Sequence, residues 1–160
     1  MSTYHRIHEL IHADNTICHL KSTNKQAVLD ELIDQIKPLK GEPEAREKLI
    51  SALHEREQLC STGVGNGIAI PHARNALVGL VDDAVIVFGR SPEGIAFESI
   101  DKEPAYLFFL VVAPNVREHL QIMARLSKIL RDPRLRKNLL SADRPERVHQ
   151  VIQDAESDLD

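Results

Sequence analysis

The 160-residue sequence contains no tryptophan, and its aromatic residues are limited to two tyrosines and four phenylalanines. Aromatic side chains form the stacking surfaces on which proteins bind the bases of single-stranded nucleic acid. The net charge of −4 at pH 7 also provides no general basic surface for nucleic-acid phosphates. We therefore expect no nucleic acid among the partners of this protein.

Long hydrophobic segments are also missing. No run of 18 or more apolar residues occurs, which is the length that a membrane-spanning helix needs, and the first fifteen residues have no signal-peptide core. We therefore expect a cytoplasmic protein without direct membrane insertion.

Cysteine is scarce as well, because only Cys18 and Cys60 occur and they form no closely spaced pair. In a reducing compartment they are expected to be free thiols rather than a disulfide or a catalyst.

Several helices are predicted from apolar residues at helical spacing. One has its apolar residues between positions 28 and 36, with Ser22 or Thr23 as its cap and Pro38 at its end. In the helix expected over 116–130, one face is expected to be shared by Leu120, Met123, Leu126, Ile129 and Leu130. The acidic residues at the C-terminus are expected to fray. Further helices are predicted over residues 43–58, 135–140 and 144–152.

Continuous apolar runs predict buried strands between these helices. The expected strands cover residues 16–20, 68–70, 84–89 and 106–112, with a turn and a short edge strand over 91–100. Helices and buried strands are intermixed, and helices are grouped at both ends of the chain. The economical fold is a single α/β domain spanning residues 1–160, with a mixed β-sheet flanked by helices on both faces.

A glycine-rich turn, STGVGNG, precedes the strand and the Pro71-His72 pair. Its alternate glycines allow close backbone approach and positive φ angles. The turn is no phosphate-binding loop of the nucleotide-hydrolase type, because no Gly-Lys-Ser/Thr follows. It is no dinucleotide fingerprint either, because Ile68 stands where the third glycine would be and a helix precedes the turn. Nucleotide binding is a poor fit.

His72 lies at a rigid strand end behind Pro71, where a neutral imidazole could accept a phosphoryl group through its free ring nitrogen. Arg56 could hold the phosphoryl charge with its guanidinium. From these residues alone, a structural histidine and an arginine that stabilises a helix C-terminus remain alternatives. Further candidate donors to a phosphoryl group are the hydroxyls and backbone N–H groups of the turn, at Ser61, Thr62, Gly63 and Gly65.

The run STGVGNGIAIPHAR resembles the signature of enzyme IIA domains of the fructose/mannitol class in the bacterial phosphoenolpyruvate-dependent phosphotransferase system, which includes nitrogen-regulatory IIA proteins. The segments EREQLCSTG, VFGRSPEGIAF, FFLVVAP and HLQIMARLSKIL extend the resemblance from about Leu10 to Gln153. It implies that His72 is the phosphorylated residue, that Arg56 neutralises the phosphate, and that His119 lies close to His72 and hydrogen-bonds its ring or the phosphoryl group.

The resemblance also implies a function and its partners. The protein would accept a phosphoryl group from the histidine phosphocarrier protein and pass it to a IIB domain, with a covalent phosphohistidine and without a metal or other cofactor. The alternative is a regulatory module whose phosphorylation state controls binding to transporters or kinases. A degenerate domain that keeps only the fold is a third alternative. The sugar, the regulated target and the oligomeric state stay open.

Other charged residues have no clear place in this pattern. His5, His8 and His12 would share one helical face that could bind a metal ion, but no carboxylate or cysteine completes a signature, so solvated histidines are expected there. His19 has no assigned role. His54 and His149 are expected to be exposed, and at least one of Glu55 and Glu57 is expected to face solvent.

Overall fold

The computed structural model describes residues 6–39, 41–73 and 80–159. Within these residues one five-stranded sheet forms, with the strand order β1-β4-β5-β3-β2. The pairs β1–β4 and β3–β5 are parallel, whereas β4–β5 and β2–β3 are antiparallel. The prediction of a mixed sheet is therefore confirmed. The strands are β1 (Thr16–Ile17), β2 (Gly63–Gly65), β3 (Ile68–Ala69), β4 (Val85–Ile95) and β5 (Ala105–Val112).

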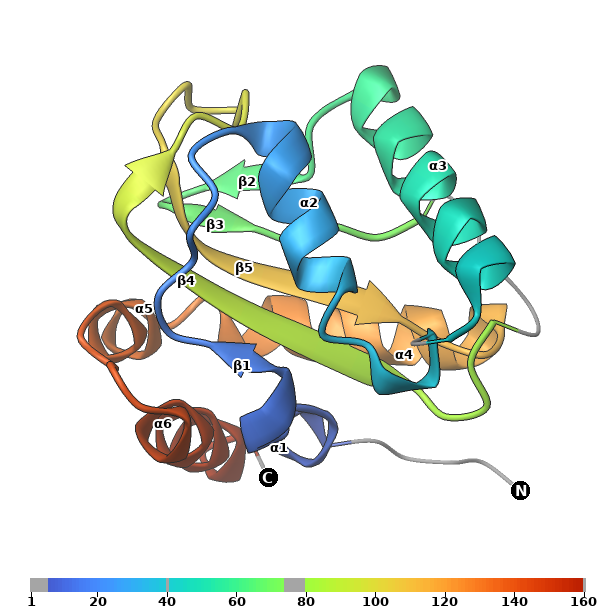
Figure 1. The fold of residues 1–160 in the computed structure, drawn as a ribbon. Coiled ribbons are helices and arrows are strands. Elements are labelled where there is room, and N and C mark those ends of the chain that lie inside the picture. Colours follow the sequence, from blue (N-terminus) through green and yellow to red (C-terminus); the bar gives the residue numbers. More distant parts are fainter. Residues whose placement is uncertain (1–5, 40, 74–79, 160) are drawn as a thin grey trace.

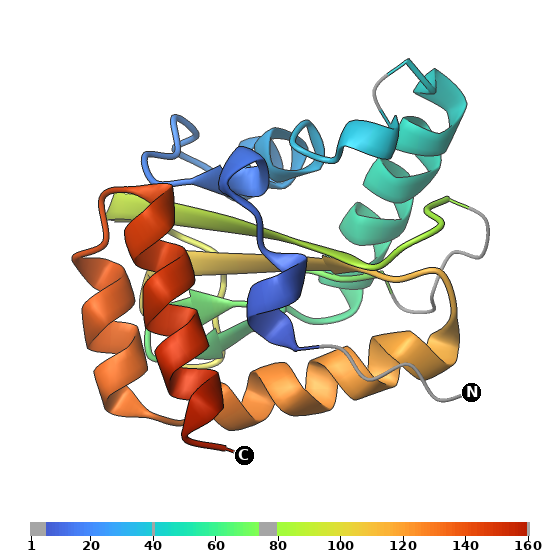
Figure 2. The same cartoon turned by 90° about the horizontal axis from the view of Figure 1, so that it is seen from below.

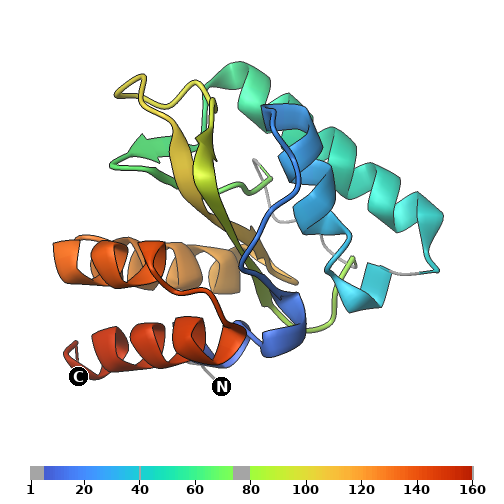
Figure 3. The ribbon, with the colours of Figure 1, turned by 60° about the vertical axis from the view of Figure 1, so that its left-hand side comes forward.

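Helices cover both faces of this sheet, as Figures 1 and 2 show. On one face lie α2 (Lys25–Ile33) and α3 (Pro43–Leu59). The other face is covered by α1 (Ile7–Leu10), α4 (Val116–Ile129), α5 (Pro133–Leu140) and α6 (Pro145–Ser157). Figure 3 shows the two helical layers separated by the sheet. Two short 3₁₀ helices, Ala13–Asn15 and Lys37–Leu39, complete the elements of the described chain.

The central strands β4 and β5 have side chains buried on both faces of the sheet. Successive residues of a strand point to opposite faces. Phe109 accordingly packs against Phe88 beside the α4–α6 layer, while Phe108 packs against Phe97 beside α2 and α3, with ring centroids 5.2 and 5.4 Å apart. This two-sided core explains why both strands are continuous apolar runs in the sequence.

The cap and the end of helix α2 differ from the prediction. Asn24, rather than Ser22 or Thr23, caps the helix, because its side-chain oxygen accepts a hydrogen bond of 2.9 Å from the backbone N–H of Ala27. The side-chain oxygen of an asparagine at this position accepts a hydrogen bond from an otherwise unpaired N–H of the first helical turn, as the hydroxyl of serine or threonine does. The helix ends at Ile33, several residues before Pro38.

Three expected boundaries are also wrong. The strand expected over 16–20 contains only Thr16–Ile17, and β4 continues through the expected turn to Ile95. A register shift between Arg90 and Ile95 allows this extension, because a bulge lets a strand continue past an irregular segment. The C-terminal residues do not fray where expected, since α6 runs to Ser157 and Glu156 is fully buried.

Candidate functional site

His72 follows strand β3 and lies behind the buried residues Ile70 and Pro71. Its ring is half-buried, and Nδ1 lies 2.7 Å from the carbonyl oxygen of Ile70. A carbonyl oxygen only accepts hydrogen bonds, so Nδ1 carries the hydrogen and donates it. The other ring nitrogen, Nε2, consequently keeps its lone pair. The backbone therefore selects the tautomer in which Nε2 carries no hydrogen.

His119 reaches the same place from helix α4. The backbone N–H of Val111 donates to the carbonyl of Pro71 over 3.0 Å, which holds the end of β5 beside the segment that carries His72. Helix α4 begins shortly after β5 and is capped by Asn115, whose side chain accepts from the N–H of Glu118. The ring centroids of His72 and His119 are 5.4 Å apart. The predicted proximity of the two histidines is therefore present in the structure.

The surroundings keep both rings neutral. Burial is the main cause that lowers the pKa of His72, and the charge of Arg56 lowers it further, while the hydrogen bond to Ile70 and the charge of Glu57 act in the opposite direction. The pKa of His119 is lowered by burial and then by His72. Because both pKa values lie below 6.5, both imidazoles are neutral at pH 7. A neutral ring is the form that can attack phosphorus.

Arg56 belongs to the last turn of α3. Its Nη1 donates to the carbonyl oxygen of Cys60 over 2.6 Å and lies 3.6 Å from the Cys60 sulfur. The guanidinium thus satisfies a carbonyl that the helix end leaves free, as a basic residue in a last turn commonly does. Its effect on the pKa of His72 shows that the same charge also acts on the imidazole. The structural interpretation therefore applies to Arg56, and its neutralisation of a phosphoryl group stays a prediction.

Three of the residues expected to donate from the glycine turn, Ser61, Thr62 and Gly63, have donors engaged within the protein. The Ser61 hydroxyl donates to the carbonyl of Phe97 over 2.6 Å and accepts from the N–H of Gly63 over 3.0 Å. The Thr62 hydroxyl donates to the carboxylate of Glu57. Gly65 lies in β2 with φ of +94°, a conformation that glycine adopts without strain. These four residues shape the turn, and their binding to a phosphoryl group stays a prediction.

Glu57 is the residue of this region whose role the sequence did not show. Glu55 is exposed, which confirms that at least one of the two glutamates faces solvent, but Glu57 is only 8% exposed. Its carboxylate accepts from the backbone N–H and the hydroxyl of Thr62, and it lies 3.0 Å from the ammonium of Lys25. The available signal was an acidic residue in the last turn of a helix, where the macrodipole disfavours it.

Large apolar side chains are exposed on the elements that carry the site. They belong to the end of α3, the glycine turn and the first turns of α4. Leu120 differs from the residues with which it was expected to share a face, because it is 61% exposed beside His119 whereas Leu126 and Ile129 are buried. Large apolar side chains that are exposed on the elements of a site are candidates for protein docking. We name these residues the apolar shelf: Leu59, Val64, Val116 and Leu120.

The remaining histidines do not form a metal site in the part of the chain that the structure describes, where no group of three or more potential ligands occurs. His5 lies outside the described residues. His8 is half-buried and bonded to Glu156, whereas His12 and His19 are exposed. The expectation of full exposure is wrong for two further histidines, which are half-buried because each packs against a neighbour. His54 lies 3.4 Å from Asp30, and His149 packs edge-on against His8.

Both cysteines are free, as expected, with Cys18 buried and Cys60 exposed.

The family model described as "Phosphoenolpyruvate-dependent sugar phosphotransferase system, EIIA 2" matches residues 9–155. The chain therefore belongs to this family of phosphotransferase-system IIA domains, and the resemblance found in the sequence is confirmed. No helix within the described residues has the length and hydrophobicity needed to cross a membrane.

Relatives of two kinds are similar to the chain. A fructose-specific EIIABC component of Bacillus subtilis is 35% identical over 149 residues, which are 92% of this chain and 23% of that protein. The chain thus spans about a quarter of this relative. A nitrogen regulatory protein of Bradyrhizobium diazoefficiens is 31% identical over 148 residues, covering 91% of this chain and 94% of that protein.

The fold is that of solved IIA structures. The Escherichia coli complex of mannitol enzyme IIA with phosphorylated mannitol enzyme IIB superposes on this chain with a TM-score of 0.74 at 26% identity. The match covers 89% of this chain and 96% of the matched chain. A IIA domain of this family can therefore pair with a IIB domain.

Proposed function

We propose that the protein is a phosphocarrier in which Nε2 of His72 accepts a phosphoryl group. The observation that carries the proposal is the 2.7 Å hydrogen bond between Nδ1 and the carbonyl of Ile70. This bond leaves Nε2 with a free lone pair, and the low pKa of the ring keeps it unprotonated at pH 7. Family membership supports a role as a component of the phosphotransferase system.

In the proposed reaction the Nε2 lone pair forms the new N–P bond while the bond between phosphorus and the donor's ring nitrogen breaks. The electron pair of the broken bond returns to the donor nitrogen, so no other reactant is needed. The hydrogen on Nδ1 stays hydrogen-bonded to Ile70. The phosphorylated ring therefore carries positive charge, which makes His72 a good leaving group for the next transfer.

The charge of the transferred group requires cations and donors around it. We assign this role to Arg56, whose charge already acts on His72, and to His119, whose ring lies 5.4 Å from the His72 ring between centroids. A dianionic phosphoryl group beside His119 would raise the pKa of that ring, so that it gains a proton and donates to a phosphoryl oxygen. With these protein groups the transfer uses no metal or other cofactor.

The proposed donor is the phosphorylated histidine phosphocarrier protein, and the proposed acceptor is a IIB domain in the cytoplasm. Both would dock on the apolar shelf, whose exposed residues belong to the elements that carry the site. The IIA–IIB pairing in the mannitol complex supports the acceptor. The transported sugar is not specified by any residue of this site.

A regulatory role is the second candidate, because the similarity to a nitrogen regulatory protein extends over nearly the whole of both chains. In this case the phosphoryl group on His72 would act as a signal. Incubation of the phosphorylated protein with purified IIB domains separates the two roles. Rapid loss of the phosphoryl group to a IIB domain supports transport, whereas retention with every IIB domain of the same cell supports regulation.

Mass spectrometry after exposure to phosphoenolpyruvate and the upstream phosphotransfer proteins tests the phosphocarrier function. We expect a gain of one acid-labile phosphate on the peptide that contains His72. His72→Ala abolishes the gain, whereas the control His19→Ala, at an exposed histidine, retains it. Full phosphorylation of His72→Ala would contradict the proposal.

A further inference from the structure

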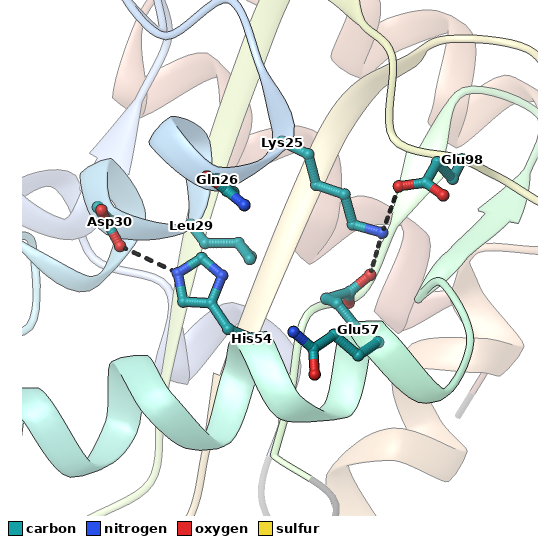
Figure 4. Close-up of a pocket in the computed structure, with 8 residues that line it drawn as sticks. Lys25, Gln26, Leu29, Asp30, His54, Glu57 and Glu98 are labelled. Carbon is teal, nitrogen blue, oxygen red and sulfur yellow. Dashed lines mark hydrogen bonds and ion pairs between the residues drawn. The ribbon is translucent and has the colours of Figure 1, made fainter.

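A pocket of about 540 Å³ lies between α2 and α3, and the buried residue Glu57 is part of its lining. Figure 4 shows the ammonium of Lys25 between the carboxylates of Glu57 and Glu98 at one end of this pocket. Lys25 Nζ is 3.0 Å from Glu57 and 3.6 Å from Glu98, and it also lies 4.9 Å from the centre of the Phe97 ring. Lys25 is thus the counter-ion of Glu57.

The position of Glu57 is energetically unfavourable without these partners. A carboxylate in the last turn of a helix faces the negative end of the macrodipole, and burial removes most of its hydration. Its neighbour Glu55 shows that an acidic side chain two residues earlier on α3 can remain in solvent. The buried carboxylate is therefore held in place by Lys25 and by the two donors of Thr62.

From Thr62 the hydrogen bonds continue to the imidazole. The Thr62 N–H donates to Glu57 over 3.1 Å, and the Thr62 carbonyl accepts from the N–H of Ile70 over 3.0 Å. The Ile70 carbonyl in turn accepts from Nδ1 of His72 over 2.7 Å. Five residues are thereby joined into one hydrogen-bonded series: Lys25, Glu57, Thr62, Ile70 and His72.

We propose that Glu57, with Lys25 as its counter-ion, is a positioning residue for phosphoryl transfer: it anchors Thr62, and Thr62 holds Ile70 so that the Ile70 carbonyl fixes the Nδ1–H tautomer of His72. The inference rests on the proposed function of His72. The N–H and the C=O of Thr62 lie on either side of its Cα, as do those of Ile70, so the series acts by fixing the positions of these backbone groups rather than by relaying charge. Glu57 does not touch the transferred group and acts only through the turn.

The tautomer of unphosphorylated His72 is the first readout, because a residue that merely stabilised the fold would not change it. Nitrogen-15 NMR of the side chain distinguishes Nδ1–H from Nε2–H. We expect wild type and the exposed control Glu55→Gln to show Nδ1–H alone. Glu57→Ala is expected to show a mixture of both tautomers, and Glu57→Gln an intermediate mixture, because glutamine keeps an acceptor oxygen for Thr62 but loses the charge.

The rate of phosphorylation by the phosphorylated histidine phosphocarrier protein is the second readout. Small displacements of a reacting group can slow a reaction by as much as about 100-fold. We expect Glu57→Ala to lower the first-order rate at saturating donor by about 10- to 100-fold with little change in the donor concentration for half-maximal rate. Lys25→Met, which removes the counter-ion and keeps the length of the side chain, should slow the reaction less than Glu57→Ala.

Two results would overturn the proposal. The first is a folded Glu57→Ala or Glu57→Gln protein with the wild-type tautomer and a rate within twofold of wild type. The second is a rate loss equal to the unfolded fraction measured by circular dichroism. If Glu57→Ala does not fold, Glu57→Gln and Lys25→Met carry the same comparison. Because the NMR readout uses unphosphorylated protein, absence of phosphate on wild-type His72 would refute the phosphocarrier function independently of this result.

Discussion

Two neutral imidazoles, rather than one imidazole and one cation, face each other at the centre of the site. Burial lowers the pKa of both His72 and His119, and each charged state would also be disfavoured by a neighbouring positive charge. The shared environment thus suits the roles proposed for the two residues, with a neutral His72 that attacks phosphorus and a neutral His119 that can still gain a proton.

The rate of His72 phosphorylation should depend on pH with a definite sign. The neutral ring reacts, and its pKa in the folded protein lies below 6.5, so the rate rises with pH and the midpoint of this rise lies below the midpoint of an ordinary histidine. A small donor with a P–N bond, corrected for its own titration, provides the measurement. A midpoint above 6.5 would contradict the depressed pKa.

We expect both the charge and the shape of the Arg56 guanidinium to affect the rate of phosphoryl transfer, and two substitutions distinguish these effects. Arg56→Gln removes the positive charge that acts on His72 and is expected to lower the transfer rate by about 10²- to 10³-fold. Arg56→Lys should recover only part of this loss, because an ammonium lacks the bidentate fork and the donor to Cys60. The matched control is Arg46→Gln near the start of α3, where the arginine pairs with Asp34. Rapid-quench kinetics gives the rates, and equal rates for Arg56→Gln and the control would contradict this role.

Single residues differed in how far the sequence could predict them. His72 follows a strand and a proline in a contiguous motif, so its place was predictable from local spacing, and His119 was placed by resemblance. Glu57 was not predictable, because its partner Lys25 lies on another helix and only the folded chain brings the two together. Leu120 was misplaced because helical periodicity identifies an apolar residue but not whether a partner protein or the core covers it.

Helix ends and one tight turn bring the site together at the level of elements. The last turn of α3 carries Arg56 and Glu57, the first turn of α4 carries His119, and the glycine turn connects α3 to β3. The turn is held from outside by Ser99, since a Cβ on Gly63 would lie 2.9 Å from the Ser99 Cα atom and 2.2 Å from its hydroxyl oxygen. Only glycine fits this approach.

Gly63→Ala should therefore distort the turn. Forcing a methyl group into this contact is expected to destabilise the protein by about 1–3 kcal/mol, and it should slow phosphorylation of His72 because the turn leads directly to β3. The neighbouring control Val64→Ala, at an exposed position, should change stability by less than about 0.5 kcal/mol. Urea denaturation measures both variants. Equal free energies of unfolding for the two variants would contradict this prediction, because Ser99 would then move away from the added methyl group without loss of stability.

Element types were more predictable than element lengths. The helix from Pro43 and the strand that ends at Val112 were expected nearly as found, because long periodic or continuous apolar patterns define them. The extension of β4 to Ile95 was not expected, since a bulge and a glycine with φ of +84° at Gly94 carry the strand through a turn-like sequence. Such irregularities depend on pairing with a distant strand.

At the scale of the whole molecule, the two ends of the described chain are fastened to each other. Glu156 of α6 is fully buried and accepts from the backbone N–H groups of Ile7 and His8, from the His8 ring and from Arg125 of α4. Burial alone would raise the pKa of Glu156, but these donors outweigh it and hold the pKa below its ordinary value. The sequence could not predict this contact, because 148 positions separate His8 from Glu156.

Glu156→Ala should remove this connection. Loss of one partner from a buried ionic cluster is expected to cost about 3–5 kcal/mol of unfolding free energy at pH 7. Because the folded pKa of Glu156 is depressed, its stabilisation is present above pH 4.5 and declines as the pH falls through the folded pKa. Denaturation of Glu156→Ala and the exposed control Glu9→Ala at several pH values tests this. A loss equal to that of the control at pH 7 would contradict it.

The most direct test concerns the atom of His72 that binds phosphorus. Nitrogen-15 and phosphorus-31 NMR of the phosphorylated protein reports which ring nitrogen is bonded to phosphorus and which carries hydrogen. We expect phosphorus on Nε2 of His72, with the hydrogen still on Nδ1 beside the Ile70 carbonyl. Phosphorus on Nδ1, or on another histidine while His72 remains unmodified, would contradict the proposed phosphocarrier site.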